Sequence, residues 1–221
     1  MSQQAPNETP FDLAITDKLL STTRAVRRRL DLQRPVEREV ILDCLRLAQQ
    51  APTGSNRQGW SWLVISDGET KRALADLYRR NADKYLSDGA VAAARSGAAQ
   101  DERVFNSAIY LAENLQDVPV HVIPCIEIGH LPEKIPPAAW AGVMGSIFPA
   151  VWSFQLALRA RGLGSAITTL HLASADEAAK LLGLPETVMQ VALLPVAYTK
   201  GWDFKPAERP PVETITHFDR W

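Results

Sequence analysis

The longest apolar segment of the chain, residues 138–161, constrains the fold more than any other feature. It is rich in Ala, Leu, Trp and Phe, and it ends before Gly162, a residue type that often terminates helices. A helix that is apolar on most of its surface has to be buried, so we expect a central helix with an irregularity near Gly145 or Pro149. Polar residues interrupt the segment, and no apolar run is expected to reach the ~20 residues that span a bilayer.

Helical and strand-like patterns alternate around this segment. Apolar residues recur at helical spacing in residues 36–48, 69–80 and 104–116. Strand-like runs occupy residues 62–66, 118–126, 164–171 and 188–198. Ser174 and Glu177 form a capping-box pattern at the start of a further helix.

Two prolines restrict the strand expected at residues 118–126, and the absence of an obvious linker sequence bears on the number of domains. The run at 118–126 contains Pro119 and Pro124, which cannot donate hydrogen bonds to a sheet, so they require a strand end, an edge or an irregularity. The chain shows no internal repeat and no obvious linker. We therefore expect a flexible tail over residues 1–14 and one domain over residues 15–221.

Composition and charge restrict the class of protein. Hydrophobic residues make up 46% of the chain and the net charge is −1, which argues against nucleic acid as a main partner. Cys44 and Cys125 lie in apolar patterns and are expected to be buried, reduced thiols. The chain does not begin with a charged-then-apolar leader, so we expect no membrane partner and a cytoplasmic location.

Four arginines lie within six residues, at positions 24, 27, 28 and 29. The cluster could be a solvated basic face. It could also be an anion site, because guanidinium groups form bidentate hydrogen bonds with phosphate. The cluster is small, and a single bound phosphate fits it better than a nucleic acid.

A polar loop at residues 51–60 connects a helical run to a strand-like run. It contains one proline, two glycines and several short polar side chains. Glycine permits unusual backbone angles and close approach, so such a loop can bring N–H groups and hydroxyls to a ligand. The alternative is an ordinary solvent-facing connection.

Residues 81–103 have no firm apolar period, which is typical of a mobile lid or binding segment. Asn81, Lys84 and Tyr85 are its candidate substrate contacts. His171, which follows Thr168 and Thr169, is the histidine that we place near a site. His121 lies in an apolar strand pattern and is expected to be a core residue.

The chain contains no catalytic or nucleotide-binding motif of the common kinds: no Rossmann or P-loop glycine pattern, no HExxH, no GxSxG and no metal-ligand spacing. We therefore expect no catalytic side chain and no metal. Basic and Gly/Ser/Asn segments without a nucleophile are typical of enzymes whose chemistry resides in a cofactor.

Four motifs, in order and at suitable separations, make the chain resemble a known family. They are residues 23–27 (Thr-Arg-Ala-Val-Arg), 51–60 (Ala-Pro-Thr-Gly-Ser-Asn-Arg-Gln-Gly-Trp), 148–152 (Phe-Pro-Ala-Val-Trp), and 161–164 (Arg-Gly-Leu-Gly) with 168–171 (Thr-Thr-Leu-His). Over residues 15–221 the chain is similar to the FMN-dependent nitroreductases, most of all to an NAD(P)H nitroreductase branch common in mycobacteria and other actinobacteria. The resemblance implies an α+β, three-layer α/β/α fold with a mixed, mainly antiparallel sheet, in an intertwined homodimer with FMN at the subunit interface.

The resemblance also implies which residues hold FMN. Arg24 would neutralise the phosphate or ribityl end, and Arg27 would lie towards the pyrimidine edge of the flavin, with Ala25 between them. Family members often have Arg and Ser at the positions of Thr23 and Ala25, and Arg28 or Arg29 is the expected replacement. The other expected contacts are Pro52, Thr53, Gly54, Ser55 and Asn56 from the partner subunit, Thr168, Thr169 and Leu170 against the isoalloxazine ring, and Arg209 at the phosphate, with Lys205 as a weaker candidate.

The implied activity is transfer of hydride from NAD(P)H, through flavin N5, to a nitro compound, quinone or similar acceptor in a ping-pong cycle. Other chemistries on the same scaffold remain open: reductive dehalogenation, flavin fragmentation and deazaflavin-linked reduction. A non-catalytic flavin-binding protein is the remaining alternative, because a fold does not fix a function.

Overall fold

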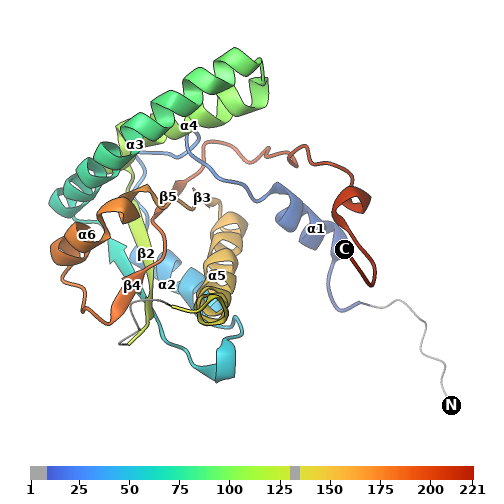
Figure 1. The fold of residues 1–221 in the computed structure, drawn as a ribbon, viewed down its shortest axis with the longest axis horizontal. Helices are drawn as coiled ribbons and strands as arrows, with labels where there is room; N and C mark the ends of the chain where they lie inside the picture. Colours follow the sequence, from blue (N-terminus) through green and yellow to red (C-terminus); the bar gives the residue numbers. More distant parts are fainter. Residues whose placement is uncertain (1–8, 130–134) are drawn as a thin grey trace. The chain divides into compact units, whose positions relative to one another are not determined.

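Five strands form one sheet in the computed structural model, which describes residues 9–129 and 135–221 (Figure 1). The strands are β1 (Trp60–Ile65), β2 (Val120–Glu127), β3 (Leu163–Ser165), β4 (Val188–Gln190) and β5 (Leu194–Tyr198). They are ordered β1-β2-β5-β3, with β4 also paired to β2, and each pair is antiparallel. An isolated bridge between Ala25 and Ser165 adds a parallel contact. The expected α+β class with a mixed, mainly antiparallel sheet is confirmed.

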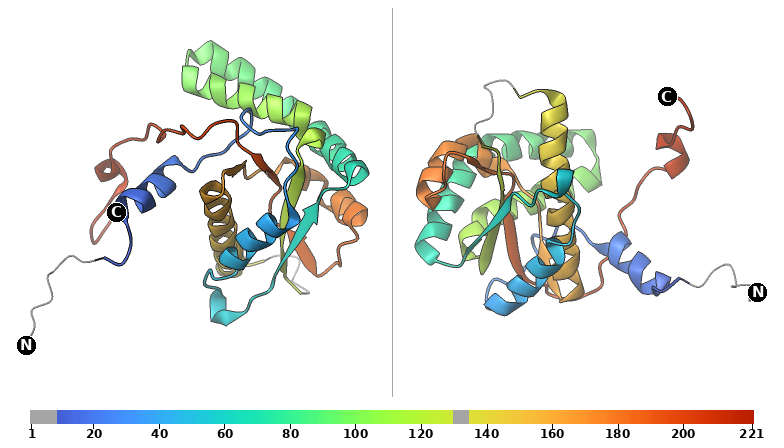
Figure 2. Two further views of the ribbon diagram at one scale, coloured as in Figure 1. Left: turned by 180° about the vertical axis from the view of Figure 1, so that it is seen from behind. Right: turned by 90° about the horizontal axis from the view of Figure 1, so that it is seen from below.

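Helices cover both faces of the sheet. The helices in the described part of the chain are α1 (Leu13–Thr22), α2 (Arg38–Ala48), α3 (Gly68–Ser96), α4 (Ala99–Asn114), α5 (Pro137–Ala160) and α6 (Ala175–Leu182), with short 3-10 helices η1 (Gly54–Asn56), η2 (Leu115–Asp117), η3 (Leu170–Ser174) and η4 (Val212–Ile215). Figures 1 and 2 show α2 and α5 on one face of the sheet and α3 and α6 on the other. The expected three-layer arrangement is therefore present.

Strand β2 is buried on both faces, which explains its nearly continuous apolar sequence. Val122 belongs to the core that β2 shares with α2 and α5, where Ile41 and Phe154 are also buried. Pro124 lies between the two stretches of β2 that pair with β5 and β4. Because proline has no N–H, the run expected as a single strand over residues 188–198 divides into β4 and β5 opposite this position.

Helix α5 is the expected central helix, and it continues through Pro149 without the expected interruption. Seven of its residues are buried, among them Ile147 and Phe154. Within the described residues α5 is also the one helix long and apolar enough to cross a membrane by length and composition alone. The expectation that no run reaches this length was wrong. The observation is weak evidence for a membrane span, because core helices pass the same test.

The segment expected as a patternless lid, residues 81–103, is helical. It forms the second half of α3 and the start of α4, which pack together as a hairpin (Figure 1). Its alanines favour a helix even without a sharp apolar stripe. Gly97, with φ +68°, ends α3 in the left-handed conformation that glycine adopts readily. The hairpin packs closely at Gly89, where a Cβ atom would lie 2.1 Å from Cε1 of Phe105.

The chain divides into two compact units, and the single domain expected over residues 15–221 includes parts of both. Unit 2 is Arg24–Trp202 and contains the sheet. Unit 1 comprises the described residues up to Thr23 together with Asp203–Trp221, and it contains α1 and η4. Residues 1–8 of the expected tail lie outside the described residues. In α1 only Thr22 is buried. The large apolar side chains that unit 1 exposes are Phe11, Leu13, Ile15, Leu20, Val212, Ile215, Phe218 and Trp221.

Candidate functional site

The arginine-rich motif lies beside the strand that leads to the Thr168 segment. The Val26 N–H donates a 2.8 Å hydrogen bond to the Ser165 carbonyl, and Ala25 forms a parallel bridge with the same residue. Three residues further on, Thr168 exchanges both backbone hydrogen bonds with Leu193. The fold thus brings together two of the sequence motifs, which are about 140 residues apart in the chain.

Arg27 carries a partly buried charge at this place. Its Nη1 donates to the Ser107 hydroxyl of α4 at 3.3 Å, and Ser107 in turn donates to the Val104 carbonyl. Burial lowers the pKa of Arg27, and the nearby Tyr78 partly opposes this shift. Within the described residues no carboxylate pairs with Arg27. A partly buried cation without an acidic partner is costly, so the position is suited to an anionic or electron-rich ligand.

Tyr78 of α3 connects Arg27 to Thr168. Its phenol oxygen lies 3.0 Å from the Thr168 hydroxyl, and only 2% of the residue is exposed. Burial raises the pKa of Tyr78, while the hydrogen bond to Thr168 and the charge of Arg27 act in the opposite direction. The sequence indicated Tyr78 only as an apolar-face residue of a helix. No local signal identifies its hydroxyl as part of a site.

The other residues of the arginine motif are more open. Ala25, Arg24 and Arg28 are exposed, and the Arg28 guanidinium lies 5.7 Å from the centre of the Tyr110 ring. Arg29 donates through Nε to the Lys200 carbonyl at 2.8 Å. Arg29 is therefore engaged with unit 2 backbone, which leaves Arg28 as the more accessible of the two expected replacements.

The polar loop of residues 52–56 has unusual backbone geometry. Ser55 and Asn56 both have a φ of 54°, whereas Gly54 is not in the positive-φ region, so the unusual conformation of the loop belongs to non-glycine residues. Left-handed non-glycine residues are strained and often mark functional segments. The Gly54 N–H donates to the Ser146 hydroxyl of α5 at 3.1 Å, and the buried Thr53 hydroxyl has no hydrogen-bond partner among the described residues. Pro52 is exposed.

The strand that follows this loop and the strand beside the arginine motif lie at opposite edges of the sheet. Trp60, just after the loop, pairs with Ile126 near the end of β2, whereas Ser165 aligns through Val196 with Val120 at its start. Six residues of strand span about 20 Å, and three strand spacings add about 14 Å across the sheet. The sheet positions next to the two predicted halves of the cofactor site are therefore well separated within a single chain.

The segment after Thr168 turns into the protein interior. Thr169 is exposed and Leu170 is half-buried, but the His171 ring is fully buried and, in the part of the chain that the structure describes, has no hydrogen-bond partner of good geometry. Burial lowers the pKa of His171 to about 4, and the nearby Gln190 side chain opposes the shift. Contact between His171 and a substrate would require this segment to open.

The candidate substrate contacts of α3 point in different directions. Asn81 donates to the Ser174 hydroxyl at 2.9 Å, which explains why Ser174 does not form the expected capping bond of α6. The Tyr85 ring is exposed and lies 6.1 Å from that of Phe105. Lys84 pairs with Asp88 at 2.8 Å.

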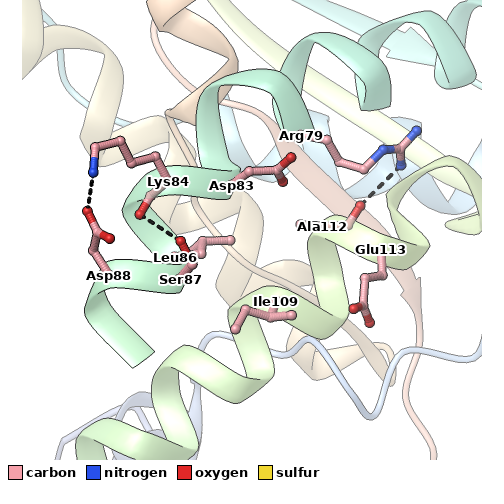
Figure 3. A pocket seen from close by; sticks show the side chains of 9 residues that line it. All are labelled: Arg79, Asp83, Lys84, Leu86, Ser87, Asp88, Ile109, Ala112 and Glu113. Carbon is pink, nitrogen blue, oxygen red and sulfur yellow. Dashed lines mark hydrogen bonds and ion pairs between the residues drawn. The ribbon is translucent and has the colours of Figure 1, made fainter. Parts of the chain in front are cut away.

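Lys84 and Asp88 line a hollow of about 550 Å³ between α3 and α4 (Figure 3). Figure 3 shows acidic and basic side chains around it in similar numbers, with Lys84 directed at Asp88 and Arg79 at the Ala112 carbonyl. Such a lining has no dominant charge. The hollow is thus a less suitable anion site than the surroundings of Arg27.

The two remaining phosphate candidates, Lys205 and Arg209, belong to unit 1. Both are exposed, and the Arg209 guanidinium donates to the adjacent Glu208 carbonyl at 3.2 Å. Across the described residues no group of three His, Cys, Asp or Glu side chains could hold a metal ion.

The fold of this chain is shared with many solved structures, 128 matching chains in all. The chain belongs to the nitroreductase family: the model of the family described as "Nitroreductase family" matches residues 20–198. No match was found among curated proteins.

Several solved structures share the fold at low sequence identity. Oxidized iodotyrosine deiodinase bound to FMN and 3-iodo-L-tyrosine is 22% identical, with a TM-score of 0.69 over 93% of this chain and 99% of that one. A BluB-like flavoprotein from Clostridium difficile 630 is 21% identical, with a TM-score of 0.66 and the same coverage of both chains. An NADH dehydrogenase/NAD(P)H nitroreductase from Parabacteroides distasonis is 19% identical, with a TM-score of 0.64 over 94% and 99%.

Proposed function

We propose that the protein is an FMN-dependent oxidoreductase that uses NAD(P)H to reduce a nitro compound, quinone or similar acceptor. The observation that carries the proposal is the Arg27 guanidinium, which has no acidic partner within the described residues and lies beside the Tyr78–Thr168 hydrogen bond. Membership of the nitroreductase family and the FMN-bound structure of a protein with the same fold support the choice of cofactor.

The residues present fit FMN. Arg27 would face the electron-rich edge of the flavin, and Thr168, Thr169 and Leu170 would contact its ring. Arg24 and Arg209 would hold the phosphate, with Arg28 or Lys205 as further donors. Bound FMN would supply the hydride-accepting centre, so the chain itself needs no acid or base. The role of the protein is to orient the flavin and to stabilise negative charge upon it.

The site is shared between two chains of a homodimer. Trp60, which follows the loop, and Ser165, which pairs with the arginine motif, lie about 20 Å apart along the strands and about 14 Å apart across the sheet in one chain. The partner's loop is the source of the missing contacts, and its orphaned Thr53 hydroxyl is available for a ligand. The exposed apolar side chains of unit 1 are suited to burial against a second copy.

Anaerobic rapid mixing tests the activity. The purified protein should carry a yellow flavin that is bleached by NADH, NADPH or a reduced deazaflavin, and a nitroarene should restore the colour. A protein that binds no flavin would refute the proposal. Bleaching without reoxidation by nitroarenes or quinones would favour dehalogenation or flavin fragmentation, and flavin binding without any bleaching would indicate a non-catalytic protein.

Complementation tests the shared site. Arg27→Ala damages one half of each site and Asn56→Ala the other, so each homodimer contains only damaged sites. Subunit exchange between the two variants creates heterodimers with one intact site, and random mixing should restore about a quarter of the wild-type sites. Recovery of flavin binding and activity supports a site formed by two chains. If exchange is verified by mass spectrometry and neither flavin binding nor activity recovers, Arg27 of one chain and Asn56 of the other do not form one site.

A further inference from the structure

Tyr78 is buried like a core residue but has a polar contact at the candidate site. Its hydroxyl is 3.0 Å from the Thr168 hydroxyl, and within the described residues this is its one hydrogen-bond partner. Thr168 already uses its backbone N–H and C=O with Leu193. The backbone groups of Thr168 are therefore engaged, and the open question is whether its hydroxyl donates to Tyr78 or accepts from it.

Either oxygen could be the donor, and the charge of Arg27 favours donation by Tyr78. The phenol is neutral and keeps its proton because burial raises the pKa of Tyr78. The guanidinium of Arg27 acts on the phenol oxygen, since its charge favours the ionised form of Tyr78. A neighbouring cation attracts the oxygen lone pairs and repels the hydroxyl hydrogen. The hydrogen of Tyr78 therefore points away from Arg27 and towards Thr168.

We infer that Tyr78 is a positioning residue that makes the Thr168 hydroxyl a hydrogen-bond donor to the bound flavin. If Tyr78 donates to Thr168 Oγ, the hydrogen of Thr168 remains for a ligand, and Thr168 is partly exposed. The hydrogen bonds then run from Tyr78 to Thr168 and from Thr168 to the ligand acceptor, and the charge of Arg27 acts on Tyr78. A polarised chain of hydrogen bonds is stronger than an isolated bond, and it stabilises a ligand most when the ligand gains electron density. This inference rests on the proposed function.

Two other contacts hold the same segment against α3. Asn81 bonds the Ser174 hydroxyl at 2.9 Å, and Arg80 pairs with Glu177 at 2.7 Å. Tyr78→Phe removes one oxygen atom and leaves both contacts in place. The variant should therefore keep the fold and lose only the orientation of Thr168.

The test compares Tyr78→Phe with Tyr198→Phe, which also deletes a phenol hydroxyl bond, the exposed one from Tyr198 to Glu37 at 2.6 Å. Thr168→Val removes the receiving hydroxyl, and Thr168→Ser keeps it. Equilibrium titration with FMN and the midpoint potential of the bound flavin are measured for each variant, with urea unfolding as a check of the fold.

In Tyr78→Phe, the ratio of the affinity for reduced flavin to the affinity for oxidised flavin should fall about tenfold. This change lowers the two-electron midpoint potential of the bound flavin by ~30 mV. Tyr198→Phe should change neither value. The effect of Tyr78→Phe should vanish in the Thr168→Val background and persist in the Thr168→Ser background. Wild-type affinity and potential in Tyr78→Phe would overturn the inference while the proposed function stands. A wild-type protein that binds no FMN would overturn both.

Discussion

Acid should destabilise the protein because two histidines are buried in the neutral state. The rings of His121 on β2 and His171 in η3 are both fully buried. His121 donates through Nε2 to the Leu115 carbonyl at 2.8 Å, and its Nδ1 has no partner. Burial lowers the pKa of His121 to about 4; the bond to Leu115 opposes this shift, and the charges of Lys71 and His171 add to it.

The magnitude follows from proton linkage. The pKa of each histidine is about 4 in the folded state, below the ordinary value of 6.5. Between these two pH values each histidine is protonated in the unfolded chain and neutral in the folded chain. Stability is therefore complete above pH 6.5 and is lost as the pH falls towards 4. At pH 5 each histidine should cost about 2 kcal/mol relative to pH 7.5, and the pair about 4 kcal/mol. That is a large part of the 5–15 kcal/mol typical of a folded domain.

Urea unfolding between pH 7.5 and pH 5, at fixed protein concentration, measures the effect. The wild type should lose about 4 kcal/mol, and His171→Gln, whose side chain does not titrate, should lose about half as much. His217→Gln, which changes an exposed histidine, should keep the wild-type dependence. A free energy of unfolding that stays constant down to pH 5 would show that the rings are hydrated or already charged in the folded state, and the argument from burial would then be wrong.

Two further predictions concern the cofactor and the helical hairpin. Arg27→Ala should weaken FMN binding by about 1.5–3 kcal/mol, the usual value of a charged hydrogen bond. Arg46→Ala removes an exposed, ion-paired arginine and should leave FMN binding unchanged. Equal FMN titration curves for the two variants would show that Arg27 does not contact the flavin. Gly89→Ala should destabilise the α3–α4 hairpin by about 1–3 kcal/mol, because its Cβ would lie 2.1 Å from Phe105 Cε1. Gly142→Ala in α5 has open space and should stabilise by about 0.5–1 kcal/mol, so urea unfolding should give opposite signs for these two changes.

Much of the fold could be predicted from periodicity because its elements are buried on defined faces. The apolar helix at residues 138–161 and the strand at 118–126 were both found where expected, within two residues. The helical structure of residues 81–103 was missed because the second half of α3 buries few side chains. The stability of this part of the hairpin comes from intrinsic helix propensity and from the close packing at Gly89. The division of the last strand run was missed because it depends on Pro124, a residue of another strand.

The candidate site was harder to predict than the fold. Arg27 and Thr168 could be named from motifs, but their proximity depends on the pairing of Val26 with Ser165. Tyr78 has the same apolar spacing as its neighbour Leu74, and only tertiary structure separates a filler of the core from a hydrogen-bond donor. The residue assignments for FMN itself stay predictions that titration and complementation address.

Helix α3 contacts both buried-histidine regions and the candidate site. Lys71, near its start, donates to the Val118 carbonyl and acts on His121, while Tyr78 and Asn81 hold the segment that contains His171. Protonation of His171 would favour opening of η3, and Thr168 lies only three residues before it. Local opening needs less free energy than global unfolding. The candidate site around Thr168 should therefore become disordered at a higher pH than the sheet does, because opening of η3 breaks the hydrogen bond between Tyr78 and Thr168 before any strand separates.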